Sequence, residues 1–464
     1  MVADPSAGEG YKDYGTNAWI ETAKDRLSTF AADVDTASYT IVRRKLGEGT
    51  LPPAAAVRVE EFVNYFRYAY AAPAAGEPFA VHMDAAPSPF NRGRHILRVG
   101  VATKAKSVSE RKPARLVFLV DVSGSMQSPD KLELAKRSLR ILVDNLKDGD
   151  TVALVTYAGS TRVVLPATGL EDKHRILAAL DELTAGGSTG MASGIELAYA
   201  EAVKGLAPGA ESRVLILSDG DANVGPTSHQ ALLDLIAGKV KEGVMLSTIG
   251  FGMGNYQDET MEQLANKGNG NNYYIDGLSQ AKRVFAEQIG ATLEVVAQDV
   301  KLQVDFDPRL VARYRLVGYE NRDLADDSFR DDKVDAGEVG AGHQVTALYE
   351  VELVKAVDKG VPLATVRVRH KVPKATSATE AAFAFDARNL ASSFAAAPAD
   401  LRFAFAAAAF ADVLRGAEDA EHWDLAEIGA IAKAAAGDDA DRKELVGLVD
   451  QARTLKSASA QLAK

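Results

Sequence analysis

The stretch "RLVFLVDVSGSM", residues 115–126, decides the fold. Its apolar run, LVFLV, is typical of a buried strand. The run stops at Asp121. Two hydroxyl side chains, Ser123 and Ser125, follow at alternate positions, and Gly124 between them lets the loop turn tightly. This stretch therefore predicts a strand that ends by placing three oxygen-bearing side chains in one loop.

Strands and helices alternate around this stretch, from Leu116 to about Gly290. The strand-like runs are LVFLV, TVALVTYA, RVVLPA, RVLILS, VMLSTIGF and NYYI, and helix-like runs such as KLELAKRSLRILVDNL and ASGIELAYAEAVKGL separate them. Such alternation predicts an α/β domain with a doubly wound, Rossmann-like, largely parallel sheet and helices on both faces. Ligands of these folds bind beyond the carboxyl ends of the strands, where Asp121 is expected.

The rest of the chain shows other patterns. Helical spacing dominates before residue 76, two strand-like runs surround a Pro/Asn/Gly turn, and strand signals return after the α/β domain, which we interpret as an insertion in a β-sandwich. The predicted segments are a disordered tether (1–16), an N-terminal helical region (17–76), two strands that join the β-domain (77–104), the α/β domain (113–291), an antiparallel β-domain (296–375) and an Ala-rich helical region (376–464).

Composition excludes several function classes. The chain has 464 residues, which favours about three domains. Its formal net charge of −11 argues against general nucleic-acid binding. Cysteine is absent, which excludes thiol catalysis, disulfides and thiolate metal sites. No apolar run approaches the roughly 18 residues that span a bilayer, so no transmembrane segment is expected in this chain.

Two further loops carry oxygen ligands. "LILSDGDANVG" offers Asp219 after another strand, and "TAGGSTGMASGIELA" offers Ser188 and Thr189 in a Gly-rich turn before a helix. Three loops with oxygen ligands and no sulfur suit hard divalent cations, Mg²⁺ above all. Hydroxyl ligands add no charge, so a carboxylate from another molecule could complete the coordination. The alternative is that Asp121 and Asp219 only cap helices.

These motifs resemble the metal-ion-dependent adhesion site of von Willebrand factor A domains. The resemblance rests on "DVSGSM", "GGST" and "LSDGD". It implies a bound Mg²⁺ or Mn²⁺, with Ca²⁺ as a further candidate, and a protein partner that offers a Glu or Asp carboxylate. The metal-binding positions that it implies are Asp121, Ser123, Ser125, Thr189 and Asp219.

The flanking sequence is similar to one branch of this family. The run "LSTFAADVDTASYTIVRRKLGEGTLPPAAAVRVEEFVNYFRYAY" resembles the N-terminal region of bacterial YfbK-like proteins. The resemblance implies an exported lipoprotein of the cell envelope, periplasmic or on the outer surface. The sequence has no lipobox cysteine and no signal core, which would fit a chain without its leader.

Rival motifs are weaker. "DGDANVG" begins like a calcium loop, but Val224 stands where the sharp-turn glycine belongs. We therefore expect Asp221 and Asn223 to stabilise their loop. "DVDTAS" imitates a phosphatase motif without a preceding strand, so Asp35 is interpreted as a helix N-cap. "GFGMGN" ends in Asn255 instead of the last dinucleotide-binding glycine and is interpreted as a plain turn.

Catalysis is not favoured by the sequence. The chain lacks a G-x-S-x-G elbow, and its seven histidines are scattered. Two-metal hydrolysis needs more than one acid per loop. The sequence therefore predicts a metal-dependent protein-binding module that is not an enzyme. The alternatives are a structural or assembly protein of the cell envelope with a stabilising metal, and a metal-dependent hydrolase.

Overall fold

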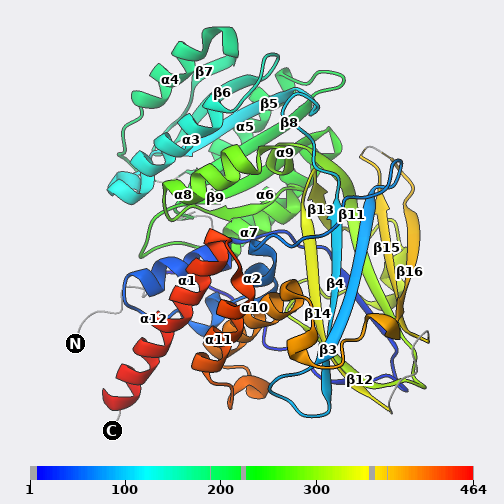
Figure 1. The fold of residues 1–464 in the computed structure, drawn as a ribbon. Helices are drawn as coiled ribbons and strands as arrows, with labels where there is room; N and C mark the ends of the chain where they lie inside the picture. Colours follow the sequence, from blue (N-terminus) through cyan, green and yellow to red (C-terminus); the bar gives the residue numbers. More distant parts are fainter. Residues whose placement is uncertain (1–7, 189, 221–225, 355–360, 374, 463–464) are drawn as a thin grey trace. The chain divides into compact units, whose positions relative to one another are not determined.

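The computed structural model describes residues 8–188, 190–220, 226–354, 361–373 and 375–462 (Figure 1). The chain forms two compact units. The first, here the α/β unit, comprises residues 1–12, 105–295 and 340–342. The second, here the β-helical unit, comprises residues 13–104, 296–339 and 343–464.

A six-stranded sheet forms the centre of the α/β unit, in the order β10-β9-β8-β5-β6-β7. All neighbours are parallel except β6 and β7. The chain turns from one side of β5 to the other between β7 and β8, so the switch point of the doubly wound sheet lies between β5 and β8. The strands are β5 (Ala114–Asp121), β6 (Thr151–Tyr157), β7 (Thr161–Gly169), β8 (Glu211–Ser218), β9 (Val244–Gly250) and β10 (Asn272–Tyr274).

Helices cover both faces of this sheet (Figure 1). Alternate residues of β5, among them Phe118 and Val120, share one apolar core with α3, α4 and α8. On the other face α5 comes so close to β6 that a Cβ on Gly194 would stand 2.8 Å from the Tyr157 Cβ. The helices are α3 (Leu134–Asp144), α4 (Lys173–Asp181), α5 (Met191–Lys204), α6 (Pro226–Lys241), α7 (Asp258–Lys267), α8 (Leu278–Lys282) and α9 (Ile289–Leu293).

The β-helical unit contains two antiparallel sheets that face each other across a common core. One has the order β1-β12-β14-β4-β3, and the other contains β13-β11-β15-β16 with β2 beside β11. Phe306 and Tyr314, from opposite sheets, stack at 4.4 Å between ring centroids. The strands are β1 (Ile20–Glu21), β2 (Leu27–Ala31), β3 (Phe79–Pro87), β4 (Arg94–Thr103), β11 (Val295–Phe306), β12 (Val311–Val317), β13 (Gly337–Gly340), β14 (Gln344–Leu353), β15 (Pro362–Lys371) and β16 (Thr379–Asp386).

Helices from both ends of the chain pack together in this unit. Phe62 packs against Phe410 and Phe66 against Phe403, which joins α2 and its end to α10. Their core includes Ile96 and Leu348, so the helices cover the outer face of one sheet. They are α1 (Ala37–Gly47), α2 (Val59–Tyr65), α10 (Ala399–Arg415), α11 (Leu425–Ala436) and α12 (Ala440–Leu462).

The predicted fold class is confirmed: a doubly wound α/β domain accompanies an antiparallel sandwich and helical segments at both ends. No helix in the part of the chain that the structure describes is long and apolar enough to cross a bilayer.

Three predicted segments need correction. The region 17–76 is not wholly helical, because β2 pairs with β11 over five residue pairs. The Ala-rich region from 376 begins with β16, which pairs with β15, so composition indicated a helix where Ala and Phe alternate along a strand. The predicted disordered tether (1–16) is wrong for its described residues, 8–16, since the Gly10 N–H donates to the Tyr256 carbonyl at 2.9 Å.

Asp35 is not a helix cap. Helix α1 begins after Thr36 without a side-chain cap. The Asp35 carboxylate instead accepts from Arg322 Nη2 at 3.2 Å, beside the Asp33–Arg322 contact at 3.0 Å. The N-cap interpretation failed because the guanidinium that holds Asp35 comes from almost 290 residues further along the chain.

Candidate metal centre

The first loop of the candidate site leaves the carboxyl end of β5. Asp121 is its last residue and is fully buried, and its Oδ1 accepts from the Ser123 N–H at 2.8 Å. The Ser123 and Ser125 hydroxyl oxygens lie 3.0 Å apart. Because an aspartate can accept from the backbone two residues on, this short turn holds the three predicted side chains of the loop together.

The second loop, before α5, is hydrogen-bonded to the first. The Gly186 N–H donates to the Val122 carbonyl at 2.8 Å, and the Gly124 N–H donates to the Gly187 carbonyl at 3.0 Å. Gly187 has φ +86°, a left-handed conformation that favours glycine. Thr189, the predicted ligand of this loop, lies outside the described residues, and the adjacent Ser188 is exposed.

The third loop follows β8, next to β5 in the sheet. The Ser218 hydroxyl donates to Asp121 Oδ2 at 3.1 Å and accepts from the Gly220 N–H at 2.9 Å. Asp219 is fully buried. Asp221 and Asn223, expected to stabilise this loop, lie outside the described residues. The structure thus brings Asp121, Ser123, Ser125 and Asp219 to the switch point of one sheet.

Burial controls the electrostatics of Asp121. It raises the pKa of Asp121 to about 6, and the Asp219 charge adds to the rise, while hydrogen bonds from Ser123 and Ser218 oppose it. A cation that binds next to such a buried acid stabilises its ionised form. The side chains offer oxygen atoms only, which is the donor set that Mg²⁺ and Mn²⁺ prefer.

The spacing of the two serine oxygens also fits a divalent cation. Adjacent ligands of an octahedral ion with bonds of 2.0–2.1 Å are about 2.8–3.0 Å apart, and neighbouring ligands in the equatorial plane of a pentagonal-bipyramidal calcium site are about 2.7–3.1 Å apart. The Ser123–Ser125 separation of 3.0 Å, at which the two hydroxyls hydrogen-bond to each other, is compatible with either ion. The described residues therefore fit a Mg²⁺ or Mn²⁺ ion, which Asp121, Ser123, Ser125 and Asp219 would hold.

Two residues that contact Asp219 were not predicted from the sequence. Lys131 is 6% exposed, and its Nζ lies 3.1 Å from Asp219 Oδ2 and 2.6 Å from Asn255 Oδ1. Asn255 Nδ2 donates to the same Asp219 oxygen at 3.0 Å. "GFGMGN" is therefore more than the plain turn that we expected. Its Gly252 makes room for the lysine, because a Cβ there would stand 2.2 Å from the Lys131 chain.

The ordered N-terminal residues pass beside this part of the unit. The Glu9 carboxylate accepts from the Gly254 N–H at 3.0 Å, and the Asp258 N–H donates to the Gly10 carbonyl at 3.1 Å. The segment therefore supports the loop that carries Asn255.

The β-helical unit has an acidic cluster that the sequence did not indicate. Carboxylate oxygens of Asp299, Asp335 and Glu338 lie within 4.8 Å of one another. Lys371 lies 2.6 Å from Asp299, so part of the charge is already paired. We assign no metal to this cluster.

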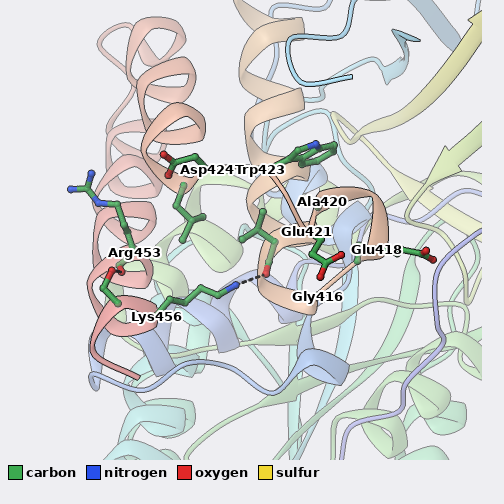
Figure 2. A pocket seen from close by; sticks show the side chains of 12 residues that line it. Gly416, Glu418, Ala420, Glu421, Trp423, Asp424, Arg453 and Lys456 are labelled. Carbon is green, nitrogen blue, oxygen red and sulfur yellow. Dashed lines mark hydrogen bonds between the residues drawn. The ribbon is translucent and has the colours of Figure 1, made fainter. Parts of the chain in front are cut away.

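A pocket of about 660 Å³ lies among α10, α11 and α12 of the same unit (Figure 2). The Lys456 ammonium donates to the Val413 carbonyl at 3.0 Å. Arg453 lies on the same helix as Lys456, and the acids Glu418 and Glu421 also line the pocket. Because both signs of charge line the pocket, it does not indicate one class of ligand.

Comparison with known proteins covers nearly the whole chain. The family model "von Willebrand factor type A domain" matches residues 116–287, "von Willebrand factor" matches residues 5–98, and "Uncharacterized protein YfbK, C-terminal" matches residues 291–455. "Uncharacterized protein YfbK" of Escherichia coli (strain K12) is 38% identical over 477 residues, which cover 97% of this chain and 82% of that protein.

More distant similarities concern smaller parts or the fold. "Uncharacterized protein sll0103" of Synechocystis sp. is 27% identical over 213 residues, 46% of this chain and 50% of that protein. The solved structure "von Willebrand factor type A from Catenulispora acidiphila" is 17% identical, covers 78% of this chain and 88% of that chain, and has a TM-score of 0.46.

Proposed function

Because the chain belongs to the YfbK-like family of von Willebrand factor type A domain proteins, we propose that it binds a protein partner through a metal-ion-dependent adhesion site. The A domain itself indicates a protein-interaction module. The finer proposal is that Asp121, Ser123, Ser125 and Asp219, with Thr189 as predicted, hold a Mg²⁺ or Mn²⁺ ion. A Glu or Asp carboxylate of the partner would complete the coordination.

One observation carries this proposal: three loops that are distant in sequence meet at the switch point between β5 and β8. Backbone hydrogen bonds join the first two loops, and the Ser218 hydroxyl joins the third to Asp121. A cap would need only one acid at one helix end, and the short helix that follows Asp121, Gly124–Gln127, begins without a side-chain cap hydrogen bond. The arrangement supports a binding centre over separate caps.

We propose binding without catalysis. Serine hydroxyls, the buried Tyr157, one lysine and one asparagine surround the two carboxylates in the described part of the centre, a set without a histidine general base. If the wild type hydrolysed generic phosphate or ester substrates and Asp219→Ala did not, the hydrolase alternative would be favoured instead.

The test uses Mn²⁺ as the probe ion. Water-proton relaxation of the Mn²⁺-bound protein should fall on titration with a short peptide that carries one glutamate, because the carboxylate displaces coordinated water. The same peptide with glutamine is the control. Equal responses to both peptides would refute a carboxylate-binding centre.

A structural ion is the remaining alternative. EDTA should abolish binding of the glutamate peptide without unfolding the protein. A large fall in melting temperature without any peptide binding would favour a stabilising metal.

For location we propose the cell envelope, with a lipid anchor on the native protein. Family resemblance supports this proposal, and fractionation of cells that produce the native protein tests it. Recovery in the cytoplasmic fraction would contradict it.

A further inference from the structure

The buried Lys131 contacts one of the candidate metal ligands, Asp219. Its ammonium contacts Asp219 and Asn255, and Asn255 contacts the same carboxylate oxygen, so the three side chains form a closed triangle with edges of 2.6–3.1 Å. Lysine is almost never this buried without a paired charge. Two further features fix its position.

The first feature is the space reserved for its aliphatic chain. Gly252 has φ +75°, and a Cβ at that position would overlap three carbons of Lys131, the nearest at 2.2 Å. The second feature is the loop around Asn255, which the Glu9 carboxylate supports through the Gly254 N–H. The lysine is therefore held toward Asp219 by its surroundings, unlike a surface side chain that rotates into a chance ion pair.

This position has a consequence for the charge of the centre. Among the described residues, the two carboxylates of Asp121 and Asp219 carry −2 and Lys131 carries +1. A bound divalent cation would bring the sum to +1 with the lysine and to zero without it. A site with one remaining positive charge is neutralised by one monoanionic carboxylate, such as a Glu or Asp side chain.

We propose that Lys131 is a built-in counter-ion of the metal centre: it weakens the binding of the cation and reserves a positive charge for the carboxylate of the partner. This inference rests on the proposed function and names a residue that positions Asp219 and sets the specificity of that site. Lys131 acts through Asp219 and through its charge.

The test is Lys131→Met, measured by calorimetric titration of Mg²⁺ into EDTA-stripped protein and then of the glutamate peptide at saturating Mg²⁺. Loss of the nearby positive charge should tighten Mg²⁺ binding by about tenfold or more and weaken peptide binding by a similar factor. A residue that only orders the loop would change the two affinities in the same direction, because Asp219 would be less well placed for both.

Two controls separate charge from packing. Lys241→Met changes the net charge equally on an exposed part of the same unit and should leave both affinities unchanged. Asn255→Ala removes one hydrogen bond to Asp219 without removing charge, so it should weaken Mg²⁺ binding. If Lys131→Met does not fold, the same two affinities are measured on Lys131→Gln, because the glutamine amide is uncharged but can still donate to Asp219.

The outcomes are distinct. Weaker or unchanged Mg²⁺ binding in a folded Lys131 variant would overturn this inference while the adhesion site stands. Absence of Mg²⁺ binding in the wild-type protein would instead overturn the proposed function on which the inference rests.

Discussion

Replacement of Asp121 by asparagine should stabilise the metal-free protein above pH 6. Burial and the Asp219 charge raise the pKa of Asp121 from 3.8 to about 6. The folded state therefore holds the proton more tightly than the unfolded state, so the stability present below pH 3.8 is lost as the pH rises through 6. A difference of about two pKa units corresponds to roughly 3 kcal/mol at pH 8, since each unit is worth about 1.4 kcal/mol.

Asparagine keeps the shape of the side chain and removes the charge. Its amide oxygen can still accept from the Ser123 N–H, but the Ser218 hydroxyl loses its acceptor, which costs about 1 kcal/mol. The expected net gain is thus about 2 kcal/mol at pH 8. At pH 5 Asp121 is mostly protonated in the folded wild type, so the gain in unfolding free energy of Asp121→Asn should shrink to about 0.5 kcal/mol.

The assay must report on the α/β unit. Both tryptophans, Trp19 and Trp423, belong to the β-helical unit, so their fluorescence is unsuitable. Hydrogen exchange of the β5 amides in EDTA measures the local free energy of opening instead. Equal or lower protection of Asp121→Asn than of the wild type at pH 8 would refute the reasoning.

Mg²⁺ should reverse the order of the two proteins. At one hundred times its dissociation constant a ligand adds about 2.7 kcal/mol to the stability of the wild type. The variant should gain far less, because it has lost a charged ligand. The acid would then be retained for metal binding at a cost in stability, which is the trade-off expected of a binding site.

Three further predictions concern single buried groups. Burial and neighbouring carboxylates raise the pKa of Glu60 to about 8, so the free energy of unfolding should fall by about 3–5 kcal/mol between pH 4.5 and 8. Urea titrations should show that Glu60→Gln removes most of this fall. An unchanged pH profile in the variant would contradict the prediction. Gly252→Ala should cost about 1–3 kcal/mol, since its Cβ would overlap Lys131 at a left-handed φ, and an unaltered melting temperature would be incompatible with that packing. Asp150→Ala should cost about 3–5 kcal/mol because the fully buried Arg111 would lose its ion pair, and a loss under 1 kcal/mol in denaturant titration would count against the contact.

The sequence predicted the parts of the fold that local pattern determines. The alternation of strands and helices specified the α/β sheet, and Asp121, Ser123 and Ser125 lie close together because a single turn connects them. Asp219 could be placed near them because parallel strands end at the same edge of a sheet. The metal itself and Thr189 stay predictions.

Contacts between distant segments could not be predicted. Lys131 stands among charged residues at the start of a helix-like run, and nothing in its neighbourhood shows that its ammonium turns toward a loop 88 residues later. Asn255 looked like a turn residue for the same reason. The strand β2 lies in a region that the sequence pattern predicts as helical, because its partner, β11, lies about 270 residues further along the chain and leaves no local signal.

Asp121 is proposed to help hold a single divalent cation. Calorimetric titration of Mg²⁺ and Mn²⁺ into EDTA-stripped protein tests it most directly, with Asp121→Ala and, as a control, Asp148→Ala, which removes an exposed acid of the same unit. We predict binding at one site in the wild type and in Asp148→Ala, and none in Asp121→Ala. Equal binding in all three proteins, or none in any, would contradict the account.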